Sequence, residues 1–87
     1  MARNDIGGTD SGKYEIINGV GVVGEHPSGW KKELNRISWN GGEPKYDLRD
    51  WSPDHEKMGK GITLTEAELR SLKKIIDAEI EILDTIL

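Results

Sequence analysis

The sequence predicts an α+β fold in which a four-stranded antiparallel β-sheet, connected as a meander, is followed by one long C-terminal α-helix. Three observations support this fold class. Before residue 65, runs of β-branched and aromatic residues have strong strand propensity. Glycine-containing turns separate these runs at short intervals, as they do in hairpins. After residue 65, apolar residues recur every three to four positions, which is the spacing of an amphipathic helix.

The length of 87 residues allows one small domain, whose core alone gives only marginal stability. There is no cysteine, so a disulfide framework and a thiolate metal site are excluded, and oligomerisation is the expected reinforcement. Residues 1–12 are rich in Gly, Asp, Asn and Ser, and we interpret them as a disordered tail that precedes a domain at residues 13–87.

Charge and hydropathy narrow the class of protein. No apolar run is long enough for a signal or membrane segment, so we expect a cytoplasmic protein without membrane contact, nucleoid-associated if its source is bacterial. The net charge of −4 argues against a polycation that coats duplex DNA. It does not exclude nucleic acid, because strand alternation can gather the cations on one face.

The first strand is expected within residues 13–25, where Tyr, Ile and Val predominate. Asn18-Gly19 inside this run is compatible with a hairpin turn or with a bulge, and we favour one bent, bulged strand. The next strand is expected in residues 30–39, after the His-Pro-Ser-Gly turn. Strict alternation puts Leu34 and Ile37 on opposite faces there, which leaves the inward face open and suggests a register break or strong twist.

Two further strands complete the meander. Asn40-Gly41-Gly42 supplies a hairpin turn into a strand at residues 45–51. A polar loop with Lys57 and Lys60 follows, and the glycines around Lys60 are expected to let the backbone approach a ligand. Residues 62–64 then form a short last strand.

The helix is expected to begin after Thr65, because Thr65 and Glu68 have the spacing of a capping box and Leu64 and Leu69 that of a hydrophobic staple. Two apolar stripes run along it. The first, predicted to cover the sheet, consists of Leu69, Leu72, Ile76, Ile80, Leu83 and Leu87. The second, predicted to form the interface of a homodimer, consists of Ile75, Ile82 and Ile86. The alternative is a single broad core face without a partner.

Strand 45–51 carries the most informative pattern. Alternation places Lys45, Asp47, Arg49 and Trp51 on one side. Two cations beside a flat indole suit a ligand that is anionic and planar, such as single-stranded nucleic acid. Two structural alternatives stay open: Arg49 can form an ion pair with a neighbouring aspartate, and Trp30 and Trp39 can be core aromatics.

Enzymatic function is not predicted. No nucleophile with a base, phosphate loop or paired-carboxylate pattern is present. Asp54-His55-Glu56 offers metal-ligand types, but consecutive residues in a loop point in different directions, so we expect no metal site, no cofactor and no small-molecule substrate. Besides nucleic-acid binding, one function class remains: a protein-interaction dimer whose exposed tryptophans bind a peptide partner.

The run YDLRDW, the acidic polar loop after it, and KMGKGITLT leading into a capped helix resemble the positive cofactor four (transcriptional coactivator p15) family of single-stranded-DNA-binding proteins. The resemblance covers Trp30 to about Ile76, and the extended first strand places the chain nearer the bacterial branch. It implies a curved four-stranded sheet and a dimer formed through the helices. It also implies a groove for one DNA strand, in transcription regulation, replication or repair, with RNA left open as a ligand.

Residue by residue, the resemblance implies that Arg49 meets phosphate, that Lys60 is the lysine of the turn before the last strand, and that Trp39 stacks on a base. Trp51 matches an aromatic position where the family has two aromatics and this chain has one. Arg36 is offset from the family's basic strand residue. With the residue pattern, this gives the candidate nucleic-acid-binding set: Lys31, Lys32, Arg36, Trp39, Lys45, Arg49, Trp51, Lys57 and Lys60.

Overall fold

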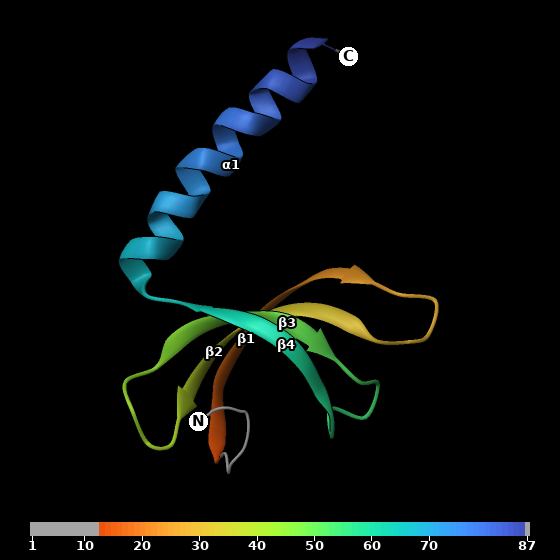
Figure 1. Cartoon of the computed structure of the whole chain (residues 1–87), viewed down its shortest axis with the longest axis vertical. Coiled ribbons are helices and arrows are strands. Elements are labelled where there is room, and N and C mark those ends of the chain that lie inside the picture. Colours follow the sequence, from red (N-terminus) through yellow and green to blue (C-terminus); the bar gives the residue numbers. More distant parts are fainter. Residues whose placement is uncertain (1–12, 87) are drawn as a thin grey trace.

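The computed structural model describes residues 13–86. It contains one four-stranded sheet with the strand order β1-β2-β3-β4, all neighbours antiparallel, followed by one helix (Figure 1). The elements are β1 (Tyr14–Glu25), β2 (Lys31–Trp39), β3 (Lys45–Trp51), β4 (Met58–Leu64) and α1 (Glu66–Ile86). The predicted meander and C-terminal helix are confirmed. The predicted tail at residues 1–12 lies outside the described residues.

Strand β1 is a single bent strand, as favoured from the sequence. Its pairing with β2 shifts register at three places, between Ile16 and Asn18, between Gly19 and Gly21, and between Val22 and Gly24. Glycines within a strand permit such bulges because they lack a side chain to pack. The register break predicted for residues 30–39 therefore lies in β1, whereas β2 pairs with β3 without a shift.

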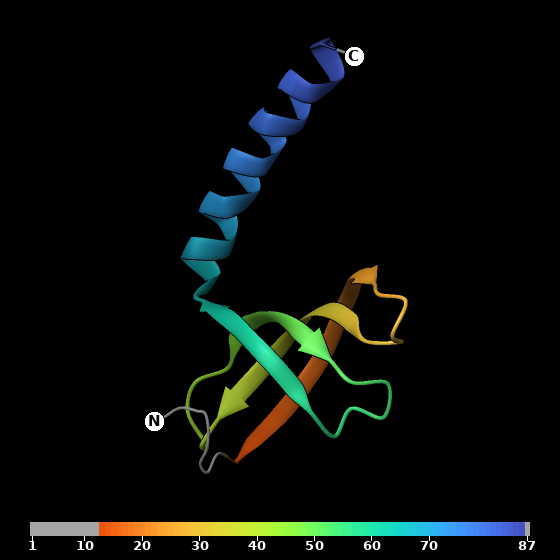
Figure 2. The same ribbon diagram turned by 45° about the vertical axis from the view of Figure 1, so that its right-hand side comes forward.

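The sheet curls strongly, so that it has a concave face on one side and a convex face from which α1 departs (Figures 1 and 2). Ile37 and Trp51, on the concave face, are each 0% exposed. Leu34 pairs with Leu48 on the convex face, where both are half-buried. The inward face that the sequence left open is thus the one that carries Ile37, and β2 contributes apolar side chains to both faces.

Gly61 is required by the close approach of β4 to β3. A Cβ atom at this position would lie 2.5 Å from the Leu48 carbonyl oxygen, and it would also collide with the Arg49 side chain. From the sequence, the glycines around Lys60 are expected to let the backbone approach a ligand. In the structure, the Arg49 side chain occupies the space beside Gly61.

The predicted capping box at the start of α1 is confirmed. The Thr65 N–H donates to Glu68 Oε1 at 2.8 Å, and the Glu68 N–H donates to Thr65 Oγ1 at 3.1 Å. Thr65 alone separates β4 from α1, and the helix extends away from the sheet (Figure 2).

The prediction that the first helical stripe covers the sheet is wrong for most of its length. Leu69 and Leu72 are half-buried, but Ile76 is 45% exposed and Ile80 47% exposed. The helix leaves the sheet directly after Thr65, so its later turns do not reach the strands. Leu87, the last residue assigned to this stripe, lies outside the described residues.

Candidate nucleic-acid interface

Four aromatic rings form a cluster on the concave face. Tyr14 lies 5.6 Å from Trp39 and 5.7 Å from Trp51, measured between ring centroids, and both pairs are tilted. The His55 imidazole stacks on Trp51 at 4.3 Å with an interplanar angle of 5°. Trp39 is half-buried, whereas Trp51 is 0% exposed. The prediction that Trp51 presents an exposed indole is therefore wrong, because Tyr14 and His55 pack against it.

Trp39 ends β2, directly before a tight turn. Asn40 and Gly41 both have positive φ, at 53° and 74°, as the two central residues of a type I′ turn require. The Gly42 N–H donates to the Trp39 carbonyl at 2.9 Å. The Asn-Gly-Gly run thus fixes the backbone that carries this indole, as the sequence predicts.

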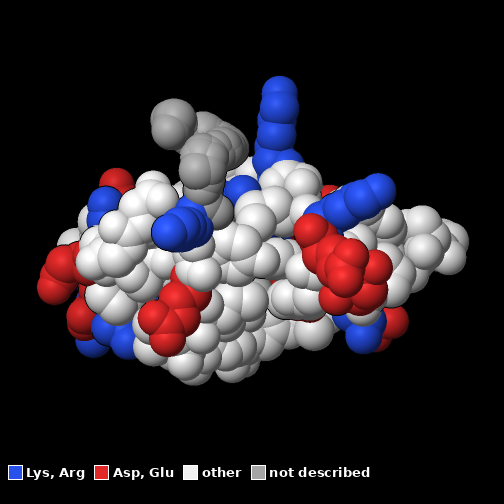
Figure 3. Space-filling model, turned by 90° about the horizontal axis from the view of Figure 1, so that it is seen from below, with Lys and Arg blue, Asp and Glu red and all other residues white. Residues whose placement is uncertain are grey.

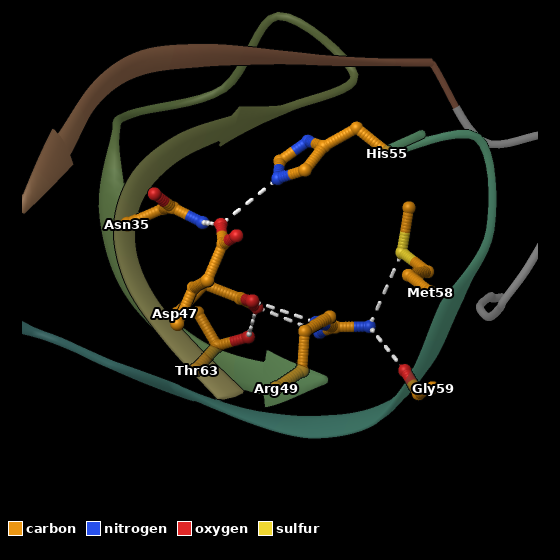
Figure 4. A network of polar contacts seen from close by, with 8 residues as sticks. Asn35, Asp47, Arg49, His55, Met58, Gly59 and Thr63 are labelled. Atoms are coloured by element: carbon orange, nitrogen blue, oxygen red, sulfur yellow. Dashed lines mark hydrogen bonds and ion pairs between the residues drawn. The ribbon is translucent and has the colours of Figure 1, made fainter. Parts of the chain in front are cut away.

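Arg49 belongs to a polar network inside the curl of the sheet (Figure 4). Its Nε and Nη2 donate to the two carboxylate oxygens of Asp47, each at 2.6 Å, and its Nη1 donates to the Gly59 carbonyl at 3.3 Å. Asp47 is fully buried, and Thr63 Oγ1 also donates to it at 3.4 Å. The structural ion pair that the sequence left open is present. The Arg49 guanidinium carbon lies 4.9 Å from the Trp39 ring centroid, so it supports that indole by a cation–π contact.

A second set of contacts holds His55. Its Nε2 lies 2.9 Å from Glu33 Oε1, and Asn35 Nδ2 donates to the same oxygen at 3.1 Å (Figure 4). The His55 N–H donates to the Ser52 carbonyl at 2.9 Å. Ser52 in turn exchanges hydrogen bonds with Lys57, through its N–H and through its hydroxyl. The loop that presents His55 is therefore tied together by its own backbone.

Carboxylates of this region are stabilised in their ionised form. The backbone N–H of Glu56 and the Ser52 hydroxyl lower the pKa of Asp54 below its usual value. Hydrogen bonds from His26, and then from Lys32, lower the pKa of Asp50. The distances are 3.0 Å and 3.2 Å respectively.

The predicted cations do not share one surface. Strand register places Lys31 opposite Trp51 and Lys45 opposite Ile37, so both belong to the concave face, and both are exposed. Lys32 pairs with Asp50 in the register and Arg36 pairs with Tyr46, which places both cations on the convex side. Lys32 and Arg36 therefore do not share a surface with Trp39, because neighbours along a strand point to opposite faces, and their contact with nucleic acid stays a prediction.

Lys57 is exposed in the loop after β3, and Lys60 is exposed where β4 shifts register against β3. Seen with the concave side toward the viewer, Lys and Arg side chains and Asp and Glu side chains both lie around a largely uncharged centre (Figure 3). The concave face therefore carries charges of both signs and is not a continuous basic patch.

Two residues of the site were missed from the sequence. Tyr14 lies opposite Trp39 because the first residue of β1 pairs with the last residue of β2. This neighbour could have been derived from the sequence, since the two predicted strands are antiparallel. His55 was considered only as a metal ligand. No local pattern indicates its stack on Trp51, because the loop conformation decides it.

Among residues 13–86, no group of three or more His, Cys, Asp and Glu side chains is arranged to hold a metal ion. In the same range, the single helix is not long and apolar enough to span a bilayer.

Comparison with known proteins agrees with this geometry. The family model described as "Transcriptional Coactivator p15 (PC4)" matches residues 26–75. A protein of Treponema pallidum (strain Nichols), named only as uncharacterized, is 46% identical over 69 residues, which cover 79% of this chain and 81% of that protein. The chain therefore belongs to the transcriptional coactivator p15 (PC4) family, in its bacterial branch, and this membership indicates a DNA-binding, coactivator-like role.

Proposed function

We propose that the protein binds single-stranded DNA on its concave face, as a homodimer and with little sequence preference, in transcription regulation, replication or repair. The observation that carries this proposal is the half-buried Trp39, which contacts Arg49 and Tyr14 on a face that also bears the exposed Lys31 and Lys45. A ring fixed in this way can accept an unpaired base without losing side-chain entropy on binding.

The expected energetics follow from these groups. Stacking of a base on an aromatic side chain contributes roughly 1–3 kcal/mol and tolerates any base. Lysines on phosphates add affinity that falls with salt, because counterions are released. Duplex DNA hides its base faces, so a face that relies on stacking prefers unpaired strands. The alternative of a peptide bound by exposed tryptophans loses support from the burial of Trp51.

The homodimer is supported by apolar surface that the described chain leaves open. A groove of about 670 Å³ lies between the convex face and the start of α1, and its apolar lining includes Val23, Leu34, Leu48, Leu69 and Ile76. Farther along the helix, Ile75 is 67% exposed, Ile82 54% and Ile86 71%. Contiguous apolar surface of this kind is typical of a subunit interface.

Sedimentation equilibrium at micromolar concentration tests the dimer. We expect twice the mass of one chain, and we expect Ile82→Lys to shift the protein toward the monomer because it places a charge in the proposed interface. Glu81→Lys, about 240° around the helix axis from Ile75 and so on its polar side, is the matched control. A monomer mass for the parent protein would contradict the assignment of Ile75, Ile82 and Ile86.

Titration with oligo-dT tests the binding. We expect quenching of tryptophan fluorescence and an affinity that falls steeply with salt, together with weaker binding of a duplex of the same length. RNA of matching length decides whether both polymers bind. Unaltered fluorescence with an excess of oligo-dT at low salt would overturn the proposed function.

A further inference from the structure

Among the aromatic rings of the concave face, Trp51 has no surface to offer a ligand. It is 0% exposed, and the His55 ring lies parallel to it at 4.3 Å. The His55 side chain, in contrast, is 40% exposed. One face of the imidazole is covered by the indole, so the exposed part of the ring includes the opposite face. The outermost aromatic surface at this end of β3 is therefore an imidazole and not an indole.

The imidazole is held in a fixed orientation. Trp51 supports one ring face, and Glu33 Oε1 lies 2.9 Å from Nε2. The backbone of His55 has a φ of 65°, in the left-handed region that residues other than glycine seldom adopt. This conformation persists because the surrounding hydrogen bonds determine it, including the one from the His55 N–H to the Ser52 carbonyl at 2.9 Å. A solvent-facing ring that is anchored by a stack, a carboxylate and a strained loop differs from an ordinary mobile surface histidine.

We propose that the outer face of the His55 imidazole is a base-stacking surface of the nucleic-acid interface, with Trp51 beneath it as its support. Histidine is among the side chains on which unpaired bases stack. The two-ring stack extends the indole toward the ligand by one ring. The inference rests on the proposed single-stranded nucleic-acid binding and adds to it a contact residue that the candidate set lacked.

Two substitutions distinguish a stacking role of His55 from a hydrogen-bonding role and from a charge role. His55→Phe keeps a flat ring on Trp51 but removes the hydrogen bond to Glu33 and any charge. His55→Asn removes the ring, keeps a donor for Glu33, and suits the positive φ, because asparagine adopts that region more readily than most residues. A stacking role requires that Phe preserves binding and Asn weakens it. A hydrogen-bonding role requires the reverse, and a charge role requires that both weaken it.

The experiment is an oligo-dT titration of the full chain at several salt concentrations. For His55→Asn we expect binding weakened roughly 5- to 150-fold, which is the loss of one stacked base. We expect no change in the slope of log affinity against log salt, since no phosphate contact is removed. For His55→Phe we expect an affinity within about threefold of the parent. Lys45→Ala should instead lower the slope by about 0.7 if Lys45 meets one phosphate.

Controls connect the result to this ring. His26→Asn is the matched control, because His26 pairs with Asp50 away from the aromatic cluster, and its affinity should equal that of the parent. Thermal unfolding of each variant separates binding from folding. An unchanged affinity for a folded His55→Asn, or equal weakening by Asn and Phe, would overturn the inference. Failure of the parent protein itself to bind oligo-dT would instead overturn the proposed function, so the two failures are distinguishable.

Discussion

Arg49→Ala should lower the free energy of unfolding by about 3–5 kcal/mol, because it leaves the carboxylate of Asp47 buried without its guanidinium partner. Asp47 is 0% exposed, and Arg49 binds both of its oxygens at 2.6 Å. A small domain has a total stability of roughly 5–10 kcal/mol, so this loss is about a third of the total or more. Urea denaturation followed by circular dichroism measures the loss.

Two companion variants sharpen this prediction. Lys73→Ala removes an ion pair of the same length, 2.6 Å to Asp77, but one whose side chains are 76% and 58% exposed, and it should cost at most about 0.5 kcal/mol. Arg49→Lys keeps the charge but loses the planar fork, so it should fall between the two. A stable Arg49→Ala protein that has lost only its affinity for oligo-dT would show instead that Arg49 acts on phosphate and not within the fold.

Trp51→Ala should also cost about 3–5 kcal/mol, because it removes the largest fully buried side chain among the described residues. The substitution would leave a cavity between Tyr14 and His55, which both contact the indole. It should also weaken oligo-dT binding in the fraction that remains folded, since the His55 ring loses its support. Denaturation and fluorescence titration on the same preparation separate these two effects.

Trp51→Phe is the matched variant. It retains an aromatic ring beneath His55, and the indole N–H that it removes has no hydrogen-bond partner in the described part of the chain. We expect it to cost no more than about 1.5 kcal/mol and to leave oligo-dT binding nearly unchanged. If Phe and Ala were equally destabilising, ring packing would not be the reason for the burial of Trp51.

The elements themselves could be predicted because their signals are local. The capping box at Thr65 and Glu68 needs only residues three apart, and the Asn40-Gly41 turn needs only its own backbone preferences. The bend of β1 could be anticipated from its glycines for the same reason.

Burial on the concave face could not be predicted, because it depends on the curl of the whole sheet. Alternation correctly placed Asp47, Arg49 and Trp51 on one side of β3, but a side that carries two charges is typical of a solvated face. Inside the curl, the charges of Asp47 and Arg49 neutralise one another in an ion pair. The curl also brings Tyr14, from the other end of the sheet, into contact with Trp51. The direction of α1 was likewise decided by its junction with β4 and not by its own apolar stripes.

The close approach at Gly61 also fixes how β4 is aligned along β3. If β4 slid by one residue in either direction, Lys60 or Ile62 would bring a side chain to the point where the Leu48 carbonyl leaves no room for a Cβ atom. Because α1 begins directly after β4, the same constraint sets where along the sheet the helix starts. The absence of one methyl group at Gly61 thus fixes where the helix starts relative to the concave face of the sheet.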